Sequence, residues 1–244
     1  MELVLGCCGL GGLRAGAYKE RFRALEVQST FYRFPREESP VKWRNFYGQE
    51  FVFTNKAYQG LTHEQNSPTW KSYPRPEGDP EKLGGLKPTE ENFALWEKTL
   101  KVSGKLGSKV VVVQLPPSFA KTTENLGNLA AFFGSVEAGP TVGVEFRHRS
   151  WFESGEEFAV IAKRYDLLSV VDPFKHPPIF VGDTLYLRLH GRGRGYKYVY
   201  TDSELRDLCR MIRGYSPERC FVFFNNTSMV EDALRFKAIW EAEK

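Results

Sequence analysis

The sequence predicts an α/β fold in the form of a single (β/α)8 barrel. Its 244 residues suit one domain of this type, for which about 250 residues are typical. Eight apolar runs bounded by turn residues alternate with segments of helical composition. The run 109–115 is apolar on both faces, as expected for a parallel strand that is covered on both sides. A doubly wound open sheet is the second architecture that this alternation allows.

The expected elements follow one another in a regular order. Strands are predicted at residues 3–8, 24–28, 51–56, 109–115, 141–147, 167–172, 184–190 and 220–225. Helices are predicted at residues 90–106, 122–133, 155–165, 202–213 and 228–243. We detect no internal repeat and no low-complexity tract, so residues 1–244 are expected to form one domain.

Residues 61–89 form an irregular segment between the third strand and the next helix. The segment contains five prolines together with Trp70 and Tyr73. A loop of this length inside a compact domain is usually functional or disordered. Because it follows the third strand, it would rise over the catalytic face of a barrel. Two expectations stay open here, a lid over the site and a solvated insertion.

Composition and charge exclude several classes of protein. With 41% hydrophobic and 26% charged residues, the chain is neither disordered nor fibrous. No run approaches the roughly 18 apolar residues of a membrane span, and the apolar start is too short for a signal peptide. We therefore expect a cytoplasmic protein. The net charge of +4 is compatible with an anionic ligand but does not by itself indicate nucleic acid.

Alternation along the strands predicts which side chains point into the barrel. Large aliphatic residues face the outer helices, so the residues between them face inward. In the seventh strand this places Leu187 outside and Arg188 inside. The same reasoning predicts an inward set of Glu26, Gln28, Lys56 or Asn55, Gln114, Glu145, Arg147, Asp172, Tyr186, Arg188, His190 and one asparagine of the Asn225-Asn226 pair. These polar residues gather toward the carboxyl ends of their strands, where barrel enzymes carry their chemistry.

The chain resembles the YecE-like proteins of the domain of unknown function 72 family over nearly its whole length. Six ordered motifs carry the resemblance: residues 25–35, Lys56-Ala57 with Thr62-His63, and residues 114–119, 144–151, 186–191 and 224–226. The resemblance implies a TIM-type barrel but no particular reaction. Two positions depart from the family pattern. The chain has Gly6-Cys7-Cys8-Gly9-Leu10 where the family usually has Gly-Thr-Ser-Gly-Trp, and Gln28 where it usually has asparagine.

The first functional hypothesis is an enzyme that acts by acid/base chemistry on a small anionic, phosphate-bearing substrate. The expected catalytic residues are Glu26, Glu145, Asp172 and His190. The expected substrate-binding residues are Gln28, Lys56, His63, Gln114, Arg147, His148, Arg188, Tyr196 and Asn225. The glycine-rich loop 191–197 follows the seventh strand, where barrels commonly bind phosphate, although it can also be a flexible basic loop in water.

Three other hypotheses use the same residues differently. A metal-assisted phosphodiesterase, nuclease or sugar isomerase would use Glu26, Glu145, Asp172 and His190 as ligands. However, the inward cations already neutralise these groups, so no cofactor is required. A non-catalytic nucleic-acid binder would use Tyr18, Lys19, Arg21, Arg23, Phe31, Tyr32, Arg33, Arg36, Arg192, Arg194 and Tyr198. Finally, the polar ring can be a buried ionic network without a ligand.

The four cysteines point to free thiols rather than to a zinc site. Cys7, Cys8, Cys209 and Cys220 lack paired CxxC spacing, and adjacent cysteines rarely bridge. Cys8 ends the first strand with its side chain predicted to face inward. A nucleophilic Cys8 is the weakest of the mechanisms considered, because a free buried cysteine is far more common.

Overall fold

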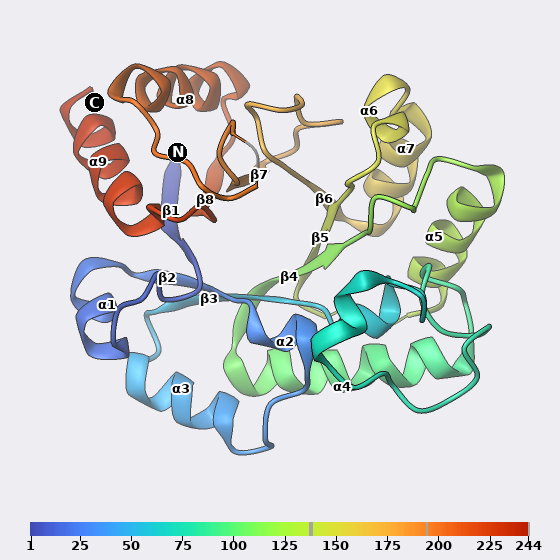
Figure 1. Cartoon of the computed structure of the whole chain (residues 1–244). Coiled ribbons are helices and arrows are strands. Elements are labelled where there is room, and N and C mark those ends of the chain that lie inside the picture. The colour runs from blue at the N-terminus through green and yellow to red at the C-terminus, as the bar shows by residue number, and fades with distance from the viewer. Residues whose placement is uncertain (137–138, 194, 244) are drawn as a thin grey trace.

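Eight parallel strands close into one barrel in chain order, and helices surround it (Figure 1). The computed structural model describes residues 1–136, 139–193 and 195–243. Its strands are β1 (Glu2–Cys8), β2 (Ala24–Val27), β3 (Val52–Lys56), β4 (Ser108–Gln114), β5 (Thr141–Glu145), β6 (Leu167–Val171), β7 (Thr184–Leu189) and β8 (Arg219–Phe224). Each strand pairs in parallel with the next, and β8 pairs with β1. The barrel prediction is confirmed, and the alternative of an open sheet is wrong.

The helices outside the barrel include all five that the sequence predicts. They are α4 (Glu90–Leu106), α5 (Thr123–Ser135), α7 (Glu156–Tyr165), α8 (Asp202–Tyr215) and α9 (Met229–Ala242). Shorter helices that the periodicity did not indicate are α1 (Ala15–Arg21), α2 (Ser29–Tyr32), α3 (Ser39–Tyr47) and α6 (Ser150–Glu153). These four run for two turns or less, or carry glycine, proline or serine, so that they leave little 3.6-residue periodicity to detect.

Capping residues set the ends of the longer helices. Thr89 accepts a hydrogen bond from the backbone N–H of Asn92 and starts α4. The same helix ends at Gly107, whose φ of 64° suits glycine. Thr201 and Glu204 form a reciprocal capping box at the start of α8. These local signals are the reason why the predicted and observed bounds of the longer helices agree to within two residues.

The barrel interior changes from apolar to charged along its axis. Its apolar part consists of Val4, Cys8, Ala24, Val110, Val112, Leu168, Val170, Tyr186, Phe221 and Phe223. Tyr186 stacks between Phe221 and Phe223, with both ring centroids 5.4 Å away. Phe221 and Phe223 therefore face inward, which settles the parity of β8. Above this packed layer, at the carboxyl ends of the strands, the inward side chains are polar.

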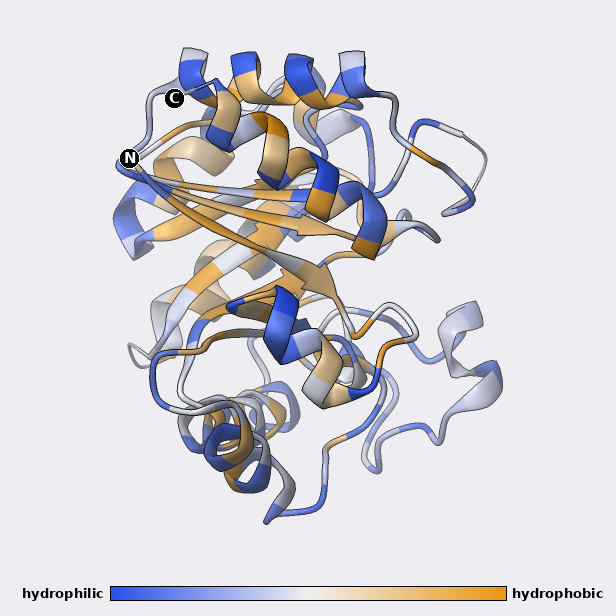
Figure 2. Cartoon of the chain, turned by 90° about the vertical axis from the view of Figure 1, so that its left-hand side faces the viewer, coloured by the Kyte–Doolittle hydropathy of each residue, from blue (hydrophilic) through white to orange (hydrophobic). Residues whose placement is uncertain are grey.

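The outer faces of the strands pack against the helices. Figure 2 shows that the apolar colour is concentrated in the strands and on the faces of helices that turn toward them, while the outer helix faces are hydrophilic. Leu185, Leu187 and Leu189 all belong to the apolar cluster on this outer side, as predicted. Within the described part of the chain, no helix is long and apolar enough to cross a membrane.

Much of residues 61–89 packs against the barrel and its helices. The 3₁₀ helix η1 (Gln59–Leu61) leads into it, and a second, η2 (Pro68–Ser72), lies in its first half. Trp70, Leu83 and Leu86 are buried in an apolar cluster that they share with α4 and α5. The backbone N–H of Gly84 donates to the carbonyl of Gly60, which closes the base of the segment. The segment is thus anchored by its own apolar residues.

Candidate functional site

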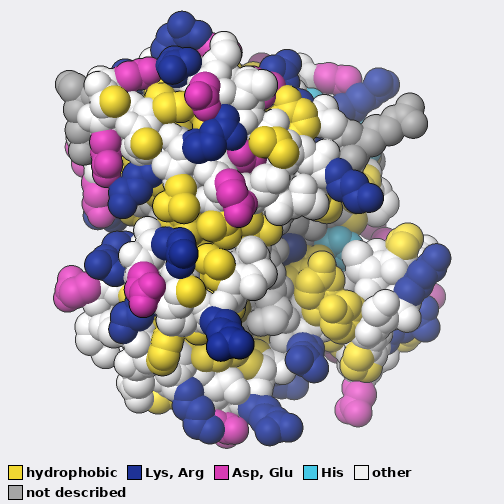
Figure 3. Space-filling view, turned by 60° about the vertical axis from the view of Figure 1, so that its left-hand side comes forward, with side chains coloured by type: hydrophobic (Ala, Val, Ile, Leu, Met, Phe, Trp, Pro, Cys, Tyr) yellow, Lys and Arg dark blue, Asp and Glu magenta, His cyan; other side chains and the backbone are white. Residues whose placement is uncertain are grey.

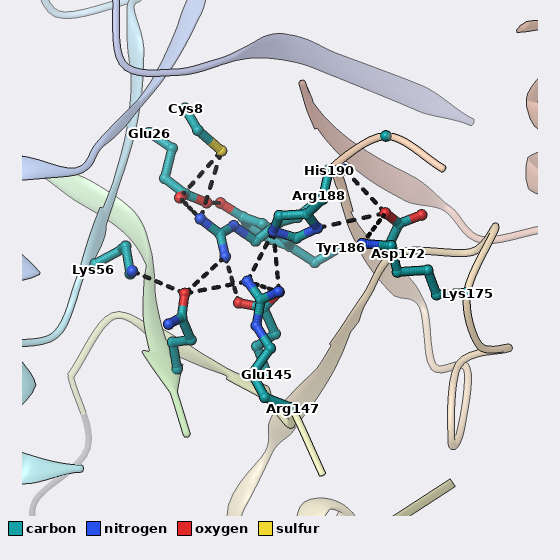
Figure 4. A network of polar contacts seen from close by, with 12 residues as sticks. Cys8, Glu26, Lys56, Glu145, Arg147, Asp172, Lys175, Tyr186, Arg188 and His190 are labelled. Carbon is teal, nitrogen blue, oxygen red and sulfur yellow. Dashed lines mark hydrogen bonds and ion pairs between the residues drawn. The ribbon is translucent and has the colours of Figure 1, made fainter. Parts of the chain in front are cut away.

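The predicted polar side chains meet at the carboxyl ends of the strands (Figure 4). Most of them belong to the last residue of a strand or to the residue that follows it. β1 and β3 end where predicted, and the other six strands end one or two residues earlier. We call the set Cys8, Glu26, Gln28, Lys56, Gln114, Glu145, Arg147, Asp172, Tyr186, Arg188 and His190 the charged cluster. Of the two candidates in the third strand, Lys56 and not Asn55 points into the barrel. Asn55 faces outward, where its side-chain oxygen accepts a hydrogen bond from Ser103 of α4 at 2.9 Å.

Arg188 lies at the centre of the charged cluster and is completely buried. Its Nη1 donates to Glu145 Oε2, and its Nη2 lies 2.9 Å from Glu26 Oε1. Burial alone would lower the pKa of Arg188, but the two carboxylates raise it well above its usual range. The guanidinium therefore links β2, β5 and β7 as a permanent cation.

Glu26 has its carboxylate fully occupied by groups of the protein. Oε2 accepts from the Tyr186 hydroxyl at 2.7 Å. Oε1 accepts from the Gln28 amide and lies 3.3 Å from the Cys8 sulfur, in addition to its contact with Arg188. Gln28 thus keeps an amide contact within the cluster despite its departure from the family pattern. The Glu26 side chain has no exposed surface, so both of its oxygens face the protein.

Glu145 is a carboxylate held between two guanidinium groups. Its Oε1 lies 3.0 Å from Arg147 Nη2, and its Oε2 accepts from Arg188. Burial would raise its pKa, but Arg147 and Arg188 together with His190 hold it at about 2. Glu145 is consequently ionised throughout the physiological pH range.

Gln114 is the neutral group on which three basic side chains converge. Its Oε1 accepts hydrogen bonds from Lys56 Nζ at 2.9 Å and from Arg147 Nη2 and Arg188 Nη1 at 3.3 Å each. An amide oxygen has two lone pairs, so three donors exceed its usual capacity. The donors that meet here therefore outnumber the lone pairs of the one acceptor.

His190 and Asp172 form a pair at the ends of β7 and β6. Asp172 Oδ2 accepts from the backbone N–H of His190 at 3.0 Å and lies 3.5 Å from its Nδ1. Gly191, with a φ of 83°, turns the chain directly after His190, and an added Cβ there would lie 2.4 Å from Tyr198 Cβ. This close approach requires glycine and fixes where β7 ends.

A cavity of about 230 Å³ lies between the ends of β5 and β6, beside the charged cluster. The polar groups that line it are Glu145, Arg147, Asp172, Lys175, His176 and His190. Among these residues, Arg147 Nε is a buried nitrogen without a hydrogen-bond partner in the described structure, and His190 Nδ1 lies 3.5 Å from Asp172 Oδ2. Unpartnered buried donors are costly. The cavity therefore has the size and a free donor that suit a small polar ligand.

His63 is brought to the edge of the charged cluster by the start of segment 61–89. Its Nδ1 lies 2.8 Å from the Thr62 hydroxyl, and its ring packs edge-on against Phe31. Burial lowers its pKa to about 3, and the neighbouring cations Lys56 and Arg147 contribute. His63 is thus a neutral imidazole under ordinary conditions.

Three residues predicted to bind substrate lie outside the contacts of the cluster. His148 Nδ1 pairs with the Ser150 hydroxyl at the start of α6. Asn225 has the inward parity, but no side-chain hydrogen bond joins it to the cluster within the described residues; its backbone N–H donates to Leu189. Tyr196 is exposed, with its ring 5.8 Å from the ring of His190.

Sequence reasoning missed several residues at this end of the barrel. Tyr32 of α2 and Tyr73 of segment 61–89 stack at 4.5 Å. Burial raises the pKa of Tyr32, as do the neighbouring Tyr73 and Tyr196, whereas nearby Arg188 lowers it. Lys175 lies 3.9 Å from Asp172, and Thr54 shares a hydrogen bond with Tyr186. Thr54 has the same parity as Lys56, so the sequence could have predicted that it faces inward. The contact between Tyr32 and Tyr73 joins distant segments, and no pattern in the sequence indicates it.

Neither a metal nor a nucleophilic cysteine fits the donors present. Among residues 1–136, 139–193 and 195–243, no three His, Cys, Asp or Glu side chains are arranged to hold a metal ion. Glu26 and Glu145 instead direct their oxygens at Arg188. Burial raises the pKa of Cys8 well above its usual range, and Glu26 adds to the effect, so Cys8 stays a thiol.

The residues considered for nucleic-acid binding are scattered in the structure. Tyr18 is buried with its hydroxyl bonded to the backbone of β1 and β2, and Phe31 is buried beneath Lys56. Arg192 and Tyr198 both contact Glu204. Arg194 lies outside the described residues. On the face that Figure 3 shows, basic and acidic side chains are both spread over the surface.

A closed parallel barrel with a charged cluster at its carboxyl end defines a protein of the (β/α)8-barrel class. The family model described as "Protein of unknown function DUF72" matches residues 13–244, and the chain belongs to this family. The resemblance predicted from the six motifs is thereby confirmed.

Individual relatives agree with this assignment. The chain is 26% identical over 248 residues to the UPF0759 protein YunF of Bacillus subtilis (strain 168), covering 87% of this chain and 80% of that protein. A crystal structure of a DUF72 family protein from Enterococcus faecalis V583 has a TM-score of 0.75 and 20% identity, with 98% and 95% of the two chains covered. Another from Thermotoga maritima MSB8 has a TM-score of 0.71 and 24% identity, with 99% and 100% covered.

More distant barrels share the fold alone. They include endonuclease IV from Thermus thermophilus, with a TM-score of 0.53 and 15% identity. A xylose isomerase domain containing protein from Salmonella typhimurium LT2 has a TM-score of 0.59 and 12% identity. Each covers at least 96% of both chains in its comparison. These identities support an argument about architecture, and the chemistry has to come from the residues of this chain.

Proposed function

We propose that the charged cluster and its cavity bind a small phosphate-bearing substrate on which the protein acts by acid/base chemistry. The observation that carries this proposal is the convergence of Lys56, Arg147 and Arg188 on the single amide oxygen of Gln114. A bound oxyanion would supply the further acceptor atoms that these donors lack.

Arg147 is the principal anion holder in this proposal. Its side chain keeps 23% of its surface exposed and lines the cavity, and its Nε has no partner there. A guanidinium with a free N–H beside a bonded one can take two oxygens of a phosphate. Lys175, across the cavity, adds a second cation. Arg188, buried against two carboxylates, positions Glu145 rather than meeting the substrate.

His190 and Asp172 supply the acid/base function. The imidazole borders the cavity, and Asp172 Oδ2 faces its Nδ1, which orients the ring. Glu26 is assigned a positioning role because its oxygens are occupied, and Glu145 stays an anion that orients Arg147. The proton carrier is thus His190, with Asp172 as its partner.

Segment 61–89 is proposed to cover this site. Tyr73 contributes one ring of the stack on Tyr32, and Tyr32 lies near Arg188 and Tyr196. Three tyrosines from three segments thus lie near one another beside the charged cluster. A ligand beneath them would be shielded from water, which strengthens its electrostatic contacts.

Titration calorimetry with inorganic phosphate tests the proposal. We expect saturable binding by the wild-type protein and at least a tenfold loss of affinity in Arg147→Ala. Arg149→Ala is the matched control, since that side chain is two residues away, 83% exposed and outside the cluster. Unchanged affinity in Arg147→Ala, or no saturable binding to the folded wild-type protein, would favour the ionic network without a ligand.

A further inference from the structure

Lys56 is a buried lysine without an acidic partner. Lys56 is the last residue of β3 and is only 4% exposed. Within residues 1–136, 139–193 and 195–243, no carboxylate oxygen lies close enough to its Nζ to form an ion pair, that is, within 4.0 Å. Buried lysines are rare unless they are paired, because an ammonium ion loses its hydration. The position of Lys56 therefore needs an explanation that a structural ion pair does not provide.

Opposing effects act on the amine of Lys56. The face of the Phe31 ring, whose centre lies 3.6 Å from Nζ, and Gln114 Oε1, which accepts from Nζ at 2.9 Å, stabilise the ammonium ion. Burial, followed by the guanidinium groups of Arg188 and Arg147, lowers the pKa of Lys56, whereas Glu145 and Glu26 raise it, and the net pKa is about 7. A neutral amine at the end of a barrel strand is nucleophilic.

We propose that Lys56 attacks the carbonyl carbon of the substrate and forms an imine with it, so that the substrates are phosphorylated aldehydes or ketones. This inference rests on the proposed anion site. Its geometric basis is Gln114 Oε1, which accepts from both Lys56 Nζ and Arg147 Nη2. The amine and the anion holder are thus separated by one oxygen atom. A short compound that replaces the Gln114 contact can place its phosphate at Arg147 and its carbonyl carbon at Lys56.

The step is balanced without an oxidant or a reductant. The nitrogen lone pair forms the C–N bond, and the carbonyl π electrons move to oxygen, which takes up a proton to give a carbinolamine. The nitrogen loses its two protons in the course of the reaction, and the former carbonyl oxygen leaves with them as one water molecule. The product is a C=N bond between Lys56 and the substrate carbon. His190, across Arg147 from this point, is available to relay the proton.

Reductive trapping tests the inference on the intact protein. The folded protein is incubated with dihydroxyacetone phosphate and sodium cyanoborohydride, and the modified peptides are mapped by mass spectrometry. We expect modification at Lys56 to be faster than at Lys42 of α3, which is 74% exposed, lies outside the charged cluster and reports ordinary lysine reactivity. Lys56→Met should lose only that modification. Unfolded protein treated in the same way shows that the Lys56 peptide is detectable.

Two comparisons separate this inference from the proposed function. With dihydroxyacetone, which lacks the phosphate, we expect at least tenfold slower trapping at Lys56, and Arg147→Ala should slow the phosphorylated probe to a similar rate. Rapid trapping by both probes, unaffected by Arg147→Ala, supports the amine and counts against the phosphate site. If inorganic phosphate binds but Lys56 is trapped no faster than Lys42, the imine is ruled out and the anion site stands.

Discussion

Arg147 donates a hydrogen bond from Nη2 to the Nε2 of His190 over 2.9 Å. A guanidinium has no acceptor, so Nε2 must be the unprotonated nitrogen of the imidazole. The ring proton therefore resides on Nδ1 and faces Asp172 Oδ2. Burial lowers the pKa of His190, and Arg147 and Arg188 add to this, against Asp172 and Glu145. Without a ligand, the imidazole is neutral and its basic nitrogen is occupied by Arg147.

Phosphate binding is expected to raise the pKa of His190. An anion that engages Arg147 draws the guanidinium away from Nε2 and adds negative charge beside the ring, and both changes favour the imidazolium. Titration of the His190 Cε1 proton by NMR, with and without saturating phosphate, measures the shift. The assignment comes from the resonance lost in His190→Asn. A pKa that stays the same or falls on phosphate binding would contradict the role given to Arg147.

Arg188→Met is expected to destabilise the barrel by about 3–5 kcal/mol, because it leaves the buried carboxylate of Glu26 without a cation and that of Glu145 with Arg147 alone. Urea unfolding followed by circular dichroism gives the free energy of unfolding. Arg192→Met, at an exposed arginine on the following loop, should change it by less than about 0.5 kcal/mol. Adding Glu26→Gln and Glu145→Gln to Arg188→Met should recover part of the loss. A triple variant no more stable than the single one would show that lost packing dominates.

The barrel and the inward face of its strands could be predicted because both depend on short-range pattern. Outward leucines alternate with polar residues in β7, and this parity predicts that Arg188 and His190 face inward. The same alternation in β2 and β5 predicts that Glu26 and Glu145 lie beside them. Glu26, Glu145 and Arg188 still lie within paired strands, but six of the eight strands end one or two residues earlier than predicted. The exact ends of the strands depend on turns such as the one at Gly191, where the close contact with Tyr198 leaves no room for a side chain.

The division of labour among the charged residues could not be predicted. Arg147 and Arg188 have the same side chain and the same parity, yet one borders a cavity and the other is enclosed between two carboxylates. The difference depends on depth in the barrel and on the side chains of neighbouring strands. The stack of Tyr32 on Tyr73 likewise arises from the path of residues 61–89, which no periodicity describes.

His63 is expected to make the protein less stable in acid. Its pKa of about 3 in the folded state lies below the ordinary value of 6.5. Between these values the unfolded chain binds the proton and the folded chain does not, so stability falls as the pH decreases, by at most about 1.4 kcal/mol per pH unit. His63→Asn keeps an acceptor toward Thr62 and should flatten this slope in urea unfolding between pH 7 and pH 4. His148→Asn, outside the cluster, is the control. Equal slopes for wild type and His63→Asn would refute the assignment.

Lys56→Met is expected to stabilise the protein at pH 6 while removing the trapping reaction. The pKa of Lys56 is about 7 in the folded state and 10.5 ordinarily. Below pH 7 both states carry the charge, and the folded state bears the whole cost of burying it. Between pH 7 and 10.5 only the unfolded chain stays protonated, so the stability of the wild type rises with pH.

The increase in the free energy of unfolding caused by Lys56→Met should therefore be largest at pH 6 and should decline toward pH 10. At pH 6 it is expected to be on the order of a few kcal/mol, from which the lost contacts with Gln114 and Phe31 are subtracted. Urea unfolding at both pH values checks this. Lys42→Met, at a lysine of α3 that is 74% exposed and outside the charged cluster, provides the control and should show no such trend. A Lys56→Met variant that is less stable than wild type at pH 6 would mean that its surroundings stabilise the charged lysine. A gain at pH 6 that fades at high pH is the pattern expected where stability is given up for a reactive amine.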